Sequence, residues 1–89
     1  MARPWEADAT APFTRRLGKS PLALGNTEHD PTCPDIWELG NGDVAVIGRD
    51  LTDAYASRLP AGVSIGEDER LVIIPGTTFI SAKADIPDE

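Results

Sequence analysis

The sequence predicts an α+β fold in which a small antiparallel sheet is built on a hairpin over residues 35–48. The first observation is the dipeptide Asn41-Gly42, which lies between two short apolar runs and favours a type I′ turn. The second is an apolar stripe with helical spacing over residues 51–59. The third is an apolar, largely β-branched run at residues 71–74. A chain of 89 residues suffices for one small domain.

We expect residues 1–31 to form an irregular N-terminal arm. Prolines recur through this segment and no apolar periodicity is present. The arm is either mobile or docks on a partner or on a second copy of the protein through its dispersed apolar residues. Residues 32–86 then form the single α+β domain, and residues 87–89 form an acidic tail.

A type I′ turn at Asn41-Gly42 would set the register of the hairpin, with Leu39 opposite Val44. Side chains alternate between the two faces of a strand. One face, which we expect to form the core, then holds Trp37, Leu39, Val44 and Val46. The other face holds Ile36, Glu38, Ala45 and Ile47.

A helix is expected near residues 51–59. Asp50 is a favourable N-cap, and Pro60 with Gly62 ends the pattern. Because a helix of this length is unstable alone, we expect it to pack on the hairpin.

A further strand is expected near residues 70–74. Its run of apolar residues predicts a strand that is central in the sheet or covered on both faces. Pro75 ends that strand and suits the first position of a short C-terminal helix extending to about residue 83. A strand at Thr77, Thr78 and Phe79 is the alternative.

The chain is acidic, with fifteen Asp and Glu against eight Lys and Arg and a net charge of −7. Such a charge repels phosphate backbones, so we expect no direct nucleic-acid binding. A basic protein partner or simple solubility explains it better. The longest apolar run is too short for a membrane span, and no signal peptide is evident, so we expect no membrane association and a cytoplasmic location.

One small cluster has side chains that could bind a metal ion or act as a nucleophile, because His29, Asp30 and Cys33 lie close together in the sequence. His29 and Cys33 would serve a metal-binding protein or a thiol enzyme. The favoured interpretation is a solvated turn followed by a small buried cysteine. We therefore expect no enzyme activity, no cofactor and no metal site.

The hairpin offers a candidate protein-binding surface instead. In the predicted register, Ile36 and Ile47 supply apolar area on one face, and Glu38 lies among them to select a basic group of a partner. We therefore predict a protein-binding site at Ile36, Glu38 and Ile47.

The hairpin also resembles small acidic actinobacterial proteins of unknown function that are often encoded beside helix-turn-helix regulators, the group that includes the developmental regulator BldB. The residues that match are Cys33, Glu38, Gly42, Val44, Ala45, Val46 and Asp50. The likeness covers about the C-terminal two-thirds of the chain. The sequence departs from the group's pattern at residues 47–50 and in the helix-like insertion that follows, and its N-terminal arm has no counterpart.

The resemblance implies a non-enzymatic accessory protein that binds and modulates a helix-turn-helix transcription regulator, with a homodimer as a further expectation. Two alternatives belong to other classes. The first is an acidic immunity-like or nucleic-acid-mimicking protein that occupies a basic site. The second is the metal-binding or thiol protein that would use His29 and Cys33.

Overall fold

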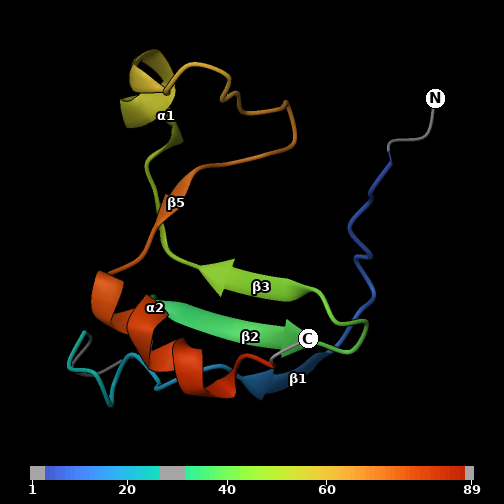
Figure 1. Cartoon of the computed structure of the whole chain (residues 1–89), viewed down its shortest axis with the longest axis vertical. Coiled ribbons are helices and arrows are strands. Elements are labelled where there is room, and N and C mark those ends of the chain that lie inside the picture. Colours follow the sequence, from blue (N-terminus) through green and yellow to red (C-terminus); the bar gives the residue numbers. More distant parts are fainter. Residues whose placement is uncertain (1–3, 27–31, 88–89) are drawn as a thin grey trace.

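A computed structural model describes residues 4–26 and 32–87 of the chain (Figure 1). Its main sheet is antiparallel, with the strand order β1 (Phe13–Arg16), β2 (Asp35–Leu39), β3 (Val44–Ile47). A second, two-stranded sheet pairs β4 (Arg49–Asp50) with β5 (Val72–Ile73). The helices are α1 (Thr52–Tyr55) with the 3₁₀ turn η1 (Ala56–Arg58), and α2 (Gly76–Ala82) with the 3₁₀ turn η2 (Lys83–Asp85).

The structure confirms the predicted α+β class and the places of its elements. The hairpin is β2 and β3, the first helix lies within residues 51–59, and a strand lies within residues 70–74. Pro75 occupies the N-cap position of α2, so the helical alternative for the C-terminal segment is the one that forms. Among the described residues, no helix is long and apolar enough to cross a membrane.

The expectation of an irregular N-terminal arm is wrong for residues 13–17. β1 pairs antiparallel with β2, although its register shifts between Phe13 and Arg15. Leu17 follows the strand, donates its amide to the carbonyl of Ile36 at 2.8 Å and is buried. Sequence patterning missed the strand because two arginines occupy it, and their side chains find acidic partners on β2.

The predicted hairpin register is also wrong, by one residue. Glu38 lies opposite Val44, and Ile36 lies opposite Val46. Only Gly42 of the turn has positive φ, at 90°, so the turn is a three-residue loop that ends in a glycine bulge. The side-chain oxygen of Asn41 accepts a hydrogen bond from the Asp43 amide at 2.9 Å. This bond favours a negative φ at Asn41, whereas a type I′ turn needs a positive φ there.

This shift changes which side chains share a face of the sheet. The face covered by α2 carries Ile36, Glu38, Val44 and Val46, whereas Trp37, Leu39, Ala45 and Ile47 lie on the opposite face. The core is therefore Leu17, Ile36 and Ala82, with Ile74 packed against them. The predicted core face of Trp37, Leu39, Val44 and Val46 is wrong.

The part of the chain beyond β3 departs from expectation as well. β5 is not central in the main sheet: of the described strands it pairs with β4 alone, and both of its side chains are exposed. Figure 1 shows α1 at the far end of this ribbon, away from the hairpin on which we expected it to pack. Local hydrogen bonds hold α1 in place instead. The Asp50 carboxylate accepts one from the Thr52 amide at 3.1 Å, and the Thr52 hydroxyl accepts one from the Leu71 amide at 2.8 Å.

Candidate protein-binding site

An apolar groove lies between α2 and the exposed half of the main sheet. α2 covers β2, where Ala82 and Ile36 are buried, but it leaves the face of β3 open. The groove has a volume of about 740 Å³. Its lining is formed mainly by Ile36, Val44, Val46, Ile74, Phe79 and Ile86.

The lining of this groove is strongly exposed for apolar side chains. Val44 retains 54% of its accessible surface and Phe79 retains 64%. Ile86, which follows η2, and Val72 of β5 are exposed and also line the groove. A contiguous apolar surface of this kind on a small domain is typical of a binding site.

The charge at one wall of the groove is already paired. Glu38 accepts a hydrogen bond from Arg15 Nε at 2.9 Å, and Arg15 Nη2 donates to the carbonyl of Asp85 at 2.7 Å. Arg15 thus ties β1 to β2 and to η2 across the end of the groove. What the open surface of the groove offers a partner is therefore mainly apolar area.

The opposite face of the sheet is held by β1. Arg16 makes a bidentate pair with Asp35, with contacts of 2.8 Å and 3.1 Å, and its guanidinium lies 4.8 Å from the ring of Trp37. The Phe13 and Trp37 ring centroids are 5.6 Å apart. The pairing with Asp35 raises the pKa of Arg16, so this ion pair persists wherever the carboxylate is ionised.

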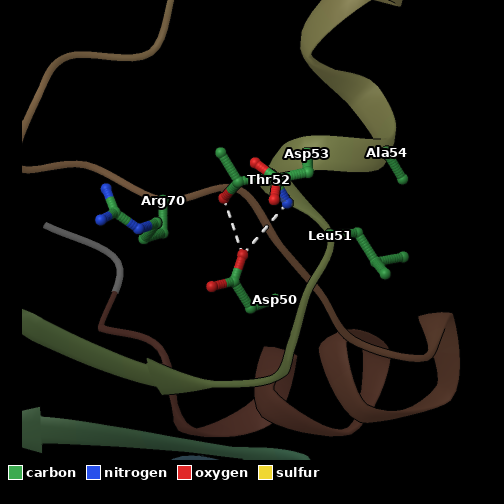
Figure 2. A pocket seen from close by; sticks show the side chains of 6 residues that line it. All are labelled: Asp50, Leu51, Thr52, Asp53, Ala54 and Arg70. Carbon is green, nitrogen blue, oxygen red and sulfur yellow. Dashed lines mark hydrogen bonds between the residues drawn. The ribbon is translucent and has the colours of Figure 1, made fainter.

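A second, polar pocket of about 620 Å³ lies where β4 meets α1, and Figure 2 shows its lining. The Thr52 hydroxyl and amide both donate to Asp50 Oδ1, and these bonds, the hydroxyl first, lower the pKa of Asp50. Arg70 donates to the carbonyls of Glu67 and Glu69. Asp50 and Thr52 thus bond each other, while Arg70 bonds the backbone of the loop that precedes it, and both sets of bonds stabilise local turns.

A third pocket, of about 320 Å³, contains the cysteine. Cys33 is a free, half-buried thiol and lines this pocket with Arg49 and Ile74. His29 and Asp30 lie outside the described residues. Within residues 4–26 and 32–87, no group of three or more His, Cys, Asp and Glu side chains could hold a metal ion.

The three residues predicted to bind a partner do not share one surface. Ile36 is buried, with 6% of its surface exposed, and belongs to the core. Glu38 lies on the same face but pairs with Arg15, and Ile47 lies on the other face. The residues that sequence reasoning missed are Val44, Val46 and Phe79. The signal for the register that exposes the two valines was the pair Asn41 and Asp43, because the Asn41 side chain bonds both the amide and the carboxylate of Asp43.

Comparisons with protein-family models, with curated proteins and with solved structures found no match to the chain. The resemblance to the actinobacterial group therefore stays a prediction.

Proposed function

We propose that this protein is a non-enzymatic protein-interaction module that binds an apolar segment of a partner protein in the groove between α2 and β3. The observation that carries the proposal is the exposure of Val44, Val46 and Phe79 around one continuous groove. Apolar side chains held open in this way gain free energy when a partner covers them.

The proposed partner is a basic DNA-binding regulator of the helix-turn-helix class. Two features support this choice. The net charge of −7 favours association with a basic protein. The resemblance of the hairpin to proteins encoded beside such regulators points the same way. The module would act on the regulator, with no contact of its own to DNA.

Affinity capture tests this proposal with a matched pair of variants. Phe79 lines the groove, whereas its neighbour Ile80 is 70% exposed on the outer side of α2 and is not part of the lining. We expect tagged protein to capture a DNA-binding regulator from the native cell extract. Phe79→Ser should lose most of that regulator, and Ile80→Ser should retain it.

Capture that is equally strong with Phe79→Ser would contradict the proposed site, and recovery of no regulator would contradict the proposed partner. Salt dependence distinguishes the alternative of an acidic mimic. A charge mimic weakens steeply as ionic strength rises, because salt screens exposed charges. Binding in the groove should weaken less steeply, because salt screens the attraction between the acidic chain and a basic partner but leaves apolar burial in place.

A further inference from the structure

β3 has an open outer edge. Among the strands of residues 4–26 and 32–87, it pairs with β2 alone, and Leu39 donates its amide to the Asp43 carbonyl at 2.8 Å. Hydrogen-bonded and non-hydrogen-bonded pairs alternate along an antiparallel ladder. The backbone groups of Ala45 and Ile47 therefore point to β2, whereas those of Val44 and Val46 point outward, where the described residues place no strand.

The other edge of the sheet is protected and this one is not. β1 carries Arg15 and Arg16, and its register is interrupted. Charged side chains and bulges discourage the addition of further strands. β3 has the uncharged sequence Val-Ala-Val-Ile and a regular register, so it lacks both features.

The open edge borders the groove. The side chains of Val44 and Val46 point to the α2 side of the sheet and line the groove, and Phe79 lies among the same lining residues. A strand added to β3 would direct every second side chain to that same side. Apolar residues at alternate positions of the added strand would therefore continue the apolar surface of the groove.

Charge and surface area identify the occupant. The accessible surface of the chain is 6895 Å², against roughly 5,000 Å² expected for a folded monomer of its mass. A standard interface buries about 800 Å² per partner, and the accessible surface of this chain exceeds that of a typical folded monomer by more than this area. A second copy would bring the same charge of −7, whereas a basic segment is attracted.

We infer that the partner binds by strand addition: an extended segment with alternating apolar residues and basic flanks pairs antiparallel or parallel along the outer edge of β3. The inference rests on the proposed function and specifies its binding mode and the chemistry of the segment. Backbone bonds to Val44 and Val46 would supply affinity, and the groove would select the side chains.

The test compares two variants at one position. Val46→Pro removes an outward amide without removing a bond to β2, whereas Val46→Ala keeps the amide and shortens the side chain. The probe is a short synthetic peptide of alternating valine and threonine with lysines at both ends. We expect binding that shifts the Val44 and Val46 amides in NMR spectra, an affinity about tenfold lower or worse for Val46→Pro, and less than about a threefold loss for Val46→Ala.

Two peptide controls keep the test decisive if Val46→Pro disturbs the fold. A peptide N-methylated throughout its central segment has no amide donors, so it should not bind. A peptide with glutamates in place of its lysines should bind about tenfold more weakly at low salt. An unchanged Leu17 amide signal would show that the Val46→Pro sheet is intact, because that amide bonds to Ile36.

Several results would overturn the inference. Equal affinity of Val46→Pro and wild type, or shifts confined to α2, would show groove binding without strand addition and would leave the proposed function standing. A wild-type dimer that Val46→Pro abolishes would assign the edge to a second copy. Absence of peptide binding up to about 1 mM would reject strand addition, while regulator capture separately decides the proposed function.

Discussion

The two halves of this molecule are held together in different ways. All of the buried residues among those described lie in the main sheet, in α2 or in the segment that joins β1 to β2, and they include Leu17, Ile36, Thr78 and Ala82. Residues 49–73, which form the β4–β5 ribbon and α1, contain no buried residue. The first half has a core, and the second is held by backbone pairing and by hydrogen bonds such as those between Asp50 and Thr52.

This contrast separates stability from binding. Stability is concentrated where β1, β2 and α2 meet, because apolar burial is the main favourable term in folding. β3 belongs to the same sheet, yet its side chains on the α2 face stay exposed. The half that contains the core therefore presents most of the groove, and of the described residues that line it, Val72 of β5 alone belongs to the other half. A surface held in place by a core loses less entropy when a partner binds.

The largest expected difference between the halves involves two glycines with the same positive φ of 83°. A Cβ on Gly18 would lie 2.5 Å from Ser81 Oγ and 2.8 Å from the Ala82 nitrogen, whereas a Cβ on Gly62 would meet nothing within 4 Å. Gly18→Ala should lower the free energy of unfolding by about 3 kcal/mol, from backbone strain plus overpacking. Gly62→Ala should lower it by about 1 kcal/mol, from strain alone.

Urea unfolding followed by tryptophan fluorescence measures both glycine variants. Equal losses of unfolding free energy for the two variants would contradict the claim that residue 18 packs closely against α2, because strain alone would then explain both. The N-terminal segment would then not be part of the stable half.

A smaller effect of opposite sign is expected within α2. The Thr78 hydroxyl is buried and has no hydrogen-bond partner among the described residues, so its desolvation cost is not offset. Thr78→Val keeps the shape and should raise the free energy of unfolding by about 1 kcal/mol. Thr77→Val, at an exposed position of the same helix, should change it little. Destabilisation by Thr78→Val in the same urea assay would show that the hydroxyl is satisfied.

The smallest effect is local and depends on pH. The pKa of Asp50 is lowered in the folded state, so its ionised form favours folding above the ordinary value of 3.8. That contribution is lost as the pH falls through and below 3.8, when the carboxylate is protonated. We expect the protection factor of the Thr52 amide, which is its intrinsic exchange rate at the given pH divided by the observed rate, to fall on acidification, with that of the Leu17 amide much less affected.

The control for this effect is Asp50→Asn, which keeps an oxygen acceptor but does not titrate. The protection factor of its Thr52 amide should lose most of the pH dependence seen in the wild type. An equal response in the variant would assign the effect to other carboxylates.

The sequence contained most of the fold but not the site. The hairpin, both helices and β5 were predictable because their signals are local: a turn dipeptide, helical spacing, and a proline at a boundary. The register was not predictable, because Asn41-Gly42 is compatible with a two-residue type I′ turn and with a three-residue loop that ends in a glycine bulge. The hydrogen bond from the Asp43 amide to the Asn41 side chain selects the three-residue loop. One residue of shift moved Val44 and Val46 to the face of Ile36, and that placement creates the groove.

β1 was unpredictable for a different reason. Its arginines resemble solvated residues in the sequence, and only the fold brings Glu38 and Asp35 opposite them. Long-range pairing of this kind leaves no periodic pattern in the chain. The groove depends on it, because Arg15 links β1, β2 and η2 at one wall.

Amide hydrogen exchange by NMR, with and without the captured regulator, tests the central claim most directly. In the free protein, we expect slow amide exchange at Leu17 and fast amide exchange throughout residues 49–73. On binding, new protection should appear at Val44 and Val46. Protection that appears within residues 50–58 and leaves β3 unchanged would contradict the claim that the core-bearing half of the molecule forms the binding surface.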